Sequence, residues 1–105
     1  MKIKFFSREI EEFIIRLEKP TIAKVLRSFD LLEKFGNQIG MPHSKALSDG
    51  LFELRIRGVQ EVRFLYFFKK TEMIVILSGF LKKTNSMPVR EMRLAKQRKK
   101  ELDAI

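Results

Sequence analysis

Residues 51–80 read LFELRIRGVQEVRFLYFFKKTEMIVILSGF. This stretch contains three runs rich in β-branched, aromatic and other apolar residues, 51–57, 61–68 and 73–80, which are separated by links of three and four residues. Links this short join antiparallel neighbours, whereas parallel strands need a crossover of a dozen or more residues. The stretch therefore predicts a three-stranded antiparallel meander.

The first two runs indicate which face of the meander carries charge. In 51–57 the even positions are apolar and the odd positions from 53 onward are charged, which is typical of a strand with one face on a core. A three-residue loop at 58–60 pairs Arg57 with Glu61 and Arg55 with Arg63. A two-residue loop would bury the charge of Arg63 in the core, so the pattern favours the odd-length loop. We therefore predict that Arg55, Arg57 and Arg63 share one surface.

The third run extends this surface. A turn closed by Lys69 and Glu72, or by Phe68 and Met73, places further side chains beside Arg63, namely Ile76, Ser78, Phe80 and Lys82. Arginines, a lysine and an aromatic ring suit a phosphate and its base better than a carboxylate. In the alternative interpretation, Arg55 pairs with Glu53 or Glu91, Phe80 belongs to the core, and the lysines are only solvated.

The flanking segments predict an α+β fold in a single domain, 1–105. Residues 2–6 resemble a first strand, and Ser7 is a candidate N-cap for an amphipathic helix that Pro20 ends. A second helix runs from Thr21 to Gly36 and forms an antiparallel hairpin with the first. Residues 37–50 are expected to form a loop. A third helix with Pro88 in its first turn follows Ser86 and runs through the basic segment 90–100 to the apolar residue Ile105.

Composition excludes several kinds of chemistry. The absence of cysteine excludes disulfides, thiolate zinc sites and cysteine nucleophiles, and the single histidine, His43, cannot form a histidine metal cluster. A lone histidine in a loop is typically solvated or locally hydrogen-bonded. No apolar run approaches eighteen residues and no signal peptide is recognisable, which predicts a soluble, cytoplasmic protein without a membrane partner.

The charge balance predicts a polyanionic partner. The formal net charge is +9, with 22 Lys and Arg against 13 acidic residues. Such an excess attracts nucleic acid ahead of anionic membrane or an acidic protein, although solubility alone is an alternative explanation. The acidic residues are scattered without the spacing of a magnesium site, so we expect no metal and no cofactor, and we expect basic residues to carry any chemistry.

Three blocks of the sequence resemble a known family: residues 42–55 with "GLFELR", residues 63–67, and residues 79–84 with "GFLKKT", followed by Pro88 and Ala95. Together they resemble the phage-derived, HigB-like branch of the RelE/ParE toxin superfamily over nearly the whole chain. The resemblance implies the RelE/ParE-like fold and the toxin half of a type II toxin–antitoxin system. It also implies a helix-turn-helix antitoxin as partner, with the toxin a monomer when free and a hetero-oligomer with the antitoxin.

The resemblance further implies a ribosome-dependent, metal-independent mRNA endoribonuclease in which the ribose 2′-hydroxyl attacks its own phosphate. Arg55 and Arg63 would then hold the scissile phosphate. Lys82, with Lys83 second, would take part in proton transfer and phosphate binding. Phe80 would flank the RNA. The predicted substrate-binding set also includes Arg57 and Ser78.

Two departures from the family leave alternatives open. Relatives often carry a histidine at the position of Ser78, and no tyrosine follows Tyr66, although some RNA-cleaving members use a C-terminal tyrosine. A ParE-like toxin that binds DNA gyrase, and a non-catalytic or degenerate RNA-binding homologue, are therefore the alternative functions.

Overall fold

The computed structural model of the chain describes residues 1–70 and 72–103, so the predictions that involve Thr71 and Ile105 lie outside the described residues. The fold is mixed α+β, as predicted. Its elements, in chain order, are β1 (Lys2–Phe5), α1 (Arg8–Ile15), α2 (Lys19–Phe35), the short 3-10 helix η1 (Gly36–Gln38), β2 (Ser44–Ala46), β3 (Phe52–Ile56), β4 (Val62–Lys69), β5 (Met73–Leu81) and α3 (Val89–Asp103).

The described strands form one sheet in the order β1-β5-β4-β3-β2. β3, β4 and β5 are consecutive antiparallel neighbours, which confirms the meander, and β1 pairs in parallel with β5. The interpretation of 37–50 as a loop is wrong at β2, which pairs with β3. This edge strand is only three residues long. It is also held by a residue far away in the sequence, because the Ser44 hydroxyl lies 2.6 Å from the Tyr66 hydroxyl on β4.

The register between β3 and β4 agrees with the alternation of the sequence. Arg55 pairs with Arg63, and Ile56 pairs with Val62. This pairing confirms the odd-length connection and places both arginines on one face of the sheet. The next residue of β3 on that face toward the chain start is Glu53, which pairs with Leu65.

The register between β4 and β5 corrects one prediction. Lys69 pairs with Met73, so three residues form the link and not two or four, and Ile76 faces the opposite side of the sheet from Arg63. Leu65 then pairs with Ser78 while Tyr66 pairs with Ile76, which leaves Leu77 as an extra residue in β5. This bulge shifts the alternation by one, and it returns Ser78 and Phe80 to the face of Arg63.

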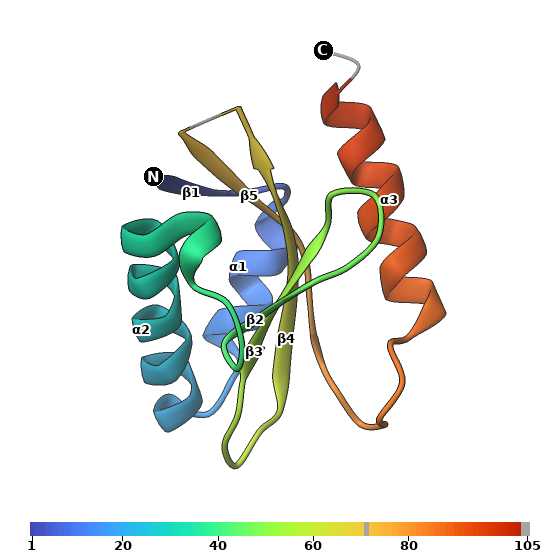
Figure 1. Cartoon of the computed structure of the whole chain (residues 1–105). Helices are drawn as coiled ribbons and strands as arrows, with labels where there is room; N and C mark the ends of the chain where they lie inside the picture. Colours follow the sequence, from blue (N-terminus) through green and yellow to red (C-terminus); the bar gives the residue numbers. More distant parts are fainter. Residues whose placement is uncertain (71, 104–105) are drawn as a thin grey trace.

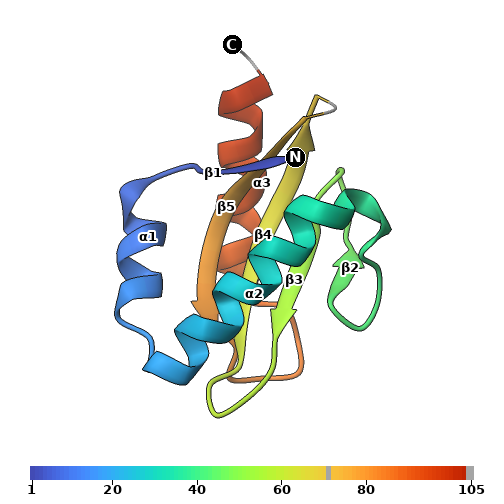
Figure 2. The ribbon, with the colours of Figure 1, turned by 90° about the vertical axis from the view of Figure 1, so that its left-hand side faces the viewer.

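Two hydrophobic clusters cover the two faces of the sheet. On one face, Ile14 of α1 and Val25 and Phe29 of α2 belong to the same cluster as the sheet residues Leu54, Phe64 and Ile76. α3 packs on the other face through Ala95 against Leu65, Phe67, Leu77 and Phe80. Figures 1 and 2 show α2 and α3 on opposite sides of the sheet. The face that carries the arginines is therefore partly covered by the basic C-terminal helix.

The helix boundaries differ slightly from those expected. α1 already ends at Ile15, and α2 begins at Lys19, so Pro20 lies in the first turn of α2 and does not end α1. Gly36 ends α2 with φ of +56°, a conformation that glycine adopts without strain. In the part of the chain that the structure describes, every helix is too short or too polar to span a bilayer.

Candidate functional site

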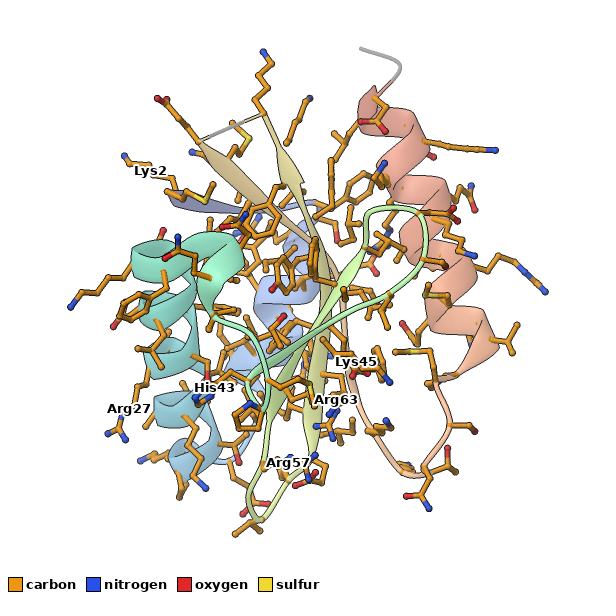
Figure 3. The ribbon with its side chains drawn as sticks, viewed as in Figure 1. Lys2, Arg27, His43, Lys45, Arg57 and Arg63 are labelled. Carbon is orange, nitrogen blue, oxygen red and sulfur yellow. The ribbon has the colours of Figure 1, made fainter. Side chains whose placement is uncertain are left out.

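A polar cavity of about 450 Å³ opens at the end of the sheet where β3 ends and β4 begins. Its lining combines the sheet with the loop that follows β5: Arg55, Arg57, Glu61, Arg63, Lys82, Lys83, Thr84 and Asn85. In Figure 3, Arg57 and Arg63 lie at this end of the sheet and Lys2 lies at the other end. The structure thus brings together Arg55, Arg63 and Lys82, which the sequence places on three different strands or strand ends. We call this hollow the basic cavity.

The lining of the basic cavity contains five cationic side chains and one carboxylate, that of Glu61. Such an excess of positive charge around a small hollow attracts anions, and guanidinium groups bind the oxygens of a phosphate in pairs. Among the described residues, no group of three or more His, Asp or Glu side chains is placed to hold a metal ion.

Arg55 is held by a buried carboxylate behind the cavity. Its Nε donates a hydrogen bond of 2.8 Å to Oε1 of Glu53, and its side chain is 14% exposed. Its Nη1 lies 4.0 Å from the sulfur of Met41, a weak acceptor. The strong acceptor therefore holds the Nε edge of the guanidinium.

Arg63 lies deeper than Arg55, with only 4% of its surface exposed. Its Nη1 donates to the carbonyl oxygen of Val62 at 2.9 Å, and its Nη2 lies 3.3 Å from Oε1 of Glu61. Its Nε is 4.0 Å from Oε2 of Glu53. Arg63 is thus placed between two carboxylates, which offset the repulsion between the paired arginines.

Glu61 forms the acidic wall of the basic cavity. The backbone N–H of Gly58 donates to Oε2 of this side chain at 3.1 Å. That hydrogen bond is the main cause that lowers the pKa of Glu61, and Arg63 and Arg57 lower it further against the opposing effect of burial. Glu61 is therefore a carboxylate anion at neutral pH.

Lys82 is positioned by the backbone. Its N–H donates to the carbonyl oxygen of Glu61 at 2.8 Å, which continues the pairing of β4 and β5 one residue past the end of β5. The side chain of Lys82 is half-buried and that of Lys83 is exposed. The backbone of Lys82 is therefore fixed at the rim of the cavity.

Comparison with protein-family models finds a match over most of the chain. The model of the family described as "Phage derived protein Gp49-like (DUF891)" matches residues 12–100, a range that includes every residue lining the basic cavity. The chain belongs to the phage-derived Gp49-like family. No curated protein matches the chain significantly.

Two residues predicted for substrate binding lie away from the basic cavity of this Gp49-like chain. Phe80 is 7% exposed and packs in the cluster beneath α3, so its ring is not available to flank an RNA base in this structure. Ser78 is 2% exposed, and its hydroxyl donates to Oε1 of Glu91 on α3 at 2.6 Å. Both share the face of Arg63, but α3 covers that part of the face.

The sequence interpretation did not assign a site role to Glu53 or Glu61. Glu53 was weighed only as an ion-pair partner of Arg55, yet it is buried between both arginines. Lys45 pairs with Glu53 across β2 and β3 and is exposed. The available signal for Glu53 was its position two residues before Arg55, which puts both side chains on the same face of a strand.

Proposed function

We propose that this Gp49-like protein is the toxin of a type II toxin–antitoxin system, in the HigB-like branch of the RelE/ParE superfamily, and that it cleaves mRNA on the ribosome without a metal ion. The observation that carries the proposal is the convergence of Arg55, Arg63 and Lys82 on one cavity. A basic cavity open to solvent suits an extended polyanion. The net charge of +9 and the membership in a phage-derived family support the same conclusion.

In the proposed reaction the arginines bind the scissile phosphate. The phosphodiester carries one negative charge, and attack by the 2′-oxygen raises this charge as a five-coordinate phosphorus forms. Arg55 and Arg63 face the developing charge with preformed N–H donors, which stabilises the transition state more than the ground state. Arg57 and Lys83 bind the neighbouring phosphates of the strand.

The proposed reaction forms one bond to phosphorus and breaks one. The 2′-oxygen forms a bond to phosphorus, the bond from phosphorus to the 5′-oxygen breaks, and Lys82 donates a proton to the departing 5′-oxygen. The products are a 2′,3′-cyclic phosphate and a 5′-hydroxyl end. Since its lowered pKa makes Glu61 a weak base, the proton of the 2′-hydroxyl passes to water.

The proposed partners of the basic cavity are messenger RNA on the ribosome and a helix-turn-helix antitoxin. Messenger RNA enters it on the ribosome, and a helix-turn-helix antitoxin neutralises the toxin by covering it. We propose that the free toxin is a monomer that acts in the cytoplasm and forms a hetero-oligomer with its antitoxin.

The test is induced expression followed by primer extension on cellular transcripts. We expect cuts in translated regions for the wild type, and a loss of at least about a hundredfold in cutting for Arg55→Ala and Lys82→Ala. The matched controls are Arg27→Ala on the exposed surface of α2 and Lys2→Ala on β1, which remove the same charges far from the cavity (Figure 3). Thermal unfolding must show that all four variants are folded.

The outcome also separates the alternative functions. Intact transcripts together with a DNA-damage response would favour a ParE-like toxin that binds gyrase. Intact transcripts with RNA binding retained would favour a non-catalytic RNA-binding homologue. The buried positions of Ser78 and Phe80 are the observation in favour of the latter, because neither can then take part in cleavage.

A further inference from the structure

Glu53 is the most deeply buried acidic side chain among the described residues, with 1% of its surface exposed. It lies on β3 on the same face as Arg55 and Arg63, directly behind the basic cavity, but it does not line that cavity. A carboxylate is rarely buried to this extent unless cations compensate it, because burial removes its hydration. The two arginines supply that compensation.

The carboxylate contacts both arginines through the same edge of the guanidinium. Oε1 of Glu53 accepts from Nε of Arg55 at 2.8 Å, and Oε2 lies 4.0 Å from Nε of Arg63. Among the described residues, neither Oε2 of Glu53 nor Nε of Arg63 has a hydrogen-bond partner. These two unpartnered atoms face each other across 4.0 Å, a separation that exceeds a hydrogen bond.

This geometry leaves the outer nitrogens for a ligand. A guanidinium has five N–H donors, and a carboxylate on the Nε edge fixes the plane of the group while its Nη nitrogens point onward. Among the residues that the structure describes, the contact of Nη1 of Arg55 is the sulfur of Met41 at 4.0 Å, which a phosphate oxygen can replace. For Arg63, Nη1 donates to the carbonyl oxygen of Val62 at 2.9 Å, whereas Nη2 contacts Glu61, whose side chain is 39% exposed and belongs to the wall of the cavity, so Nη2 is the nitrogen that faces a ligand.

We infer that Glu53 is a positioning residue, which holds the Nε edge of Arg55 and attracts that of Arg63 across 4.0 Å, so that their Nη groups meet the phosphate in the basic cavity. The inference rests on the proposed function of that cavity. Movement of Arg63 toward Glu53 would close the 4.0 Å gap and free its Nη2 from Glu61, so binding of a phosphate and closure of this gap are coupled. Glu53 itself does not touch the substrate.

A split between binding and cleavage tests this role. Glu53→Gln keeps the size of the side chain and removes one negative charge beside the cavity. Affinity for an RNA with a 2′-O-methyl group at the cut site, measured by fluorescence anisotropy, is therefore expected to equal or exceed that of the wild type. Single-turnover cleavage of ribosome-bound mRNA is expected to fall at least about tenfold, because the two arginines lose the carboxylate that orients them.

The matched control is Glu33→Gln. Glu33 is a partly buried glutamate far from the cavity, and its Oε2 accepts a structural hydrogen bond from the Ile3 N–H at 2.8 Å. After correction for the folded fraction, this variant should leave both binding and cleavage at wild-type values. If Glu53→Gln cleaves as fast as the wild type, or if its binding and cleavage decline together with the folded fraction, Glu53 is only structural and the inference is overturned.

An NMR measurement tests the positioning role of Glu53 independently of RNA cleavage. The Nε–H signals of the arginines in the ¹⁵N-labelled wild-type protein are assigned through Arg55→Lys and Arg63→Lys. We expect those of Arg55 and Arg63 to exchange slowly with water, and the signal of Arg63 to move downfield when the 2′-O-methyl RNA binds. Fast exchange of both signals, or no change on binding, would overturn the inference even if Glu53→Gln does not fold. If the wild type never cleaves RNA, the proposed function fails while this measurement still decides the role of Glu53.

Discussion

At the scale of single residues, Glu61 links the stability of the fold to the charge of the basic cavity. Its carboxylate accepts from Gly58 in the β3–β4 connection and contacts Arg63 in the cavity. The hydrogen bond from Gly58, followed by the influence of Arg63 and Arg57, keeps the pKa of Glu61 below its ordinary value of 4.5. The ionised form of Glu61 therefore stabilises the connection more than the protonated form does.

The lowered pKa predicts how stability depends on pH. A carboxyl group whose pKa is lower in the folded state stabilises the protein fully above its ordinary pKa, and this contribution is lost as pH falls through the folded pKa. Thermal unfolding from about pH 6 downward should show a steeper loss of Tm for the wild type than for Glu61→Gln below about pH 4.5. Because the side chain of Glu61 is 39% exposed, the loss of unfolding free energy that is due to its protonation should stay below about 1 kcal/mol. Parallel curves for the two proteins would contradict this assignment.

The residue scale also shows what alternation in a sequence can reveal. The period of two in 51–57 and 61–63 was sufficient to place Arg55 beside Arg63, because a shift of one residue would have buried a charge. Alternation says which face a side chain takes but not what covers that face. Ser78 and Phe80 lie on the predicted face because the bulge in β5 compensates for the wrong turn length. The alternative interpretation placed Phe80 in the core, whereas the burial of Ser78 beneath α3 was not predicted.

At the scale of elements, Gly79 allows β5, β4 and α1 to approach one another closely. A Cβ at this position would lie 2.7 Å from Cε1 of Phe64 on β4 and 3.1 Å from Cδ2 of Phe13 on α1. Gly79→Ala should therefore lower the free energy of unfolding by about 1–3 kcal/mol through overpacking. Gly40→Ala is no suitable control, because φ is positive at Gly40, whereas Ser86→Ala on the exposed loop should change stability little. Urea unfolding measures both variants, and an unchanged Gly79→Ala midpoint would show that the rings move aside freely.

The contact between β5 and α3 predicts that a histidine at position 78 would be poorly accommodated. Ser78 is 2% exposed, and its hydroxyl donates to Glu91 beneath α3. A larger imidazole at this position must push α3 outward, so Ser78→His should lower the free energy of unfolding by about 1–3 kcal/mol and should not increase RNA cleavage. Differential scanning fluorimetry and the primer-extension assay measure the two effects. A stable and more active Ser78→His protein would show that α3 is easily displaced.

Elements were predictable to the extent that their signals are local. The meander, the first strand and the helices follow from runs of apolar residues and from Pro and Gly at their ends. β2 was missed because three residues carry no measurable alternation, and its position depends on pairing with β3 and on the contact of Ser44 with Tyr66. The bulge at Leu77 was missed because the choice between turn lengths depends on packing against both faces.

At the scale of the whole molecule, the net charge of +9 provides a general attraction for RNA, whereas the basic cavity provides specific phosphate contacts. The salt dependence of RNA affinity distinguishes the general attraction from the specific phosphate contacts. For the 2′-O-methyl RNA, Arg55→Ala should reduce the slope of log Kd against log salt concentration by about 0.7, the value of one phosphate contact on a single strand. Arg27→Ala should leave the slope unchanged because Arg27 lies on α2, away from the cavity (Figure 3). Equal effects of both changes would indicate that only the total charge matters.

The central claim is that the basic cavity promotes attack by a 2′-hydroxyl on the adjacent phosphate. The most direct test is to identify the ends of the RNA fragments that the purified toxin produces on mRNA-programmed ribosomes, by mass spectrometry and by enzymatic labelling. The account predicts a 2′,3′-cyclic phosphate on one fragment and a 5′-hydroxyl on the other, with neither formed by Lys82→Ala and both formed by Lys2→Ala. Fragments with a 5′-phosphate, or equal cleavage by the two lysine variants, would contradict it.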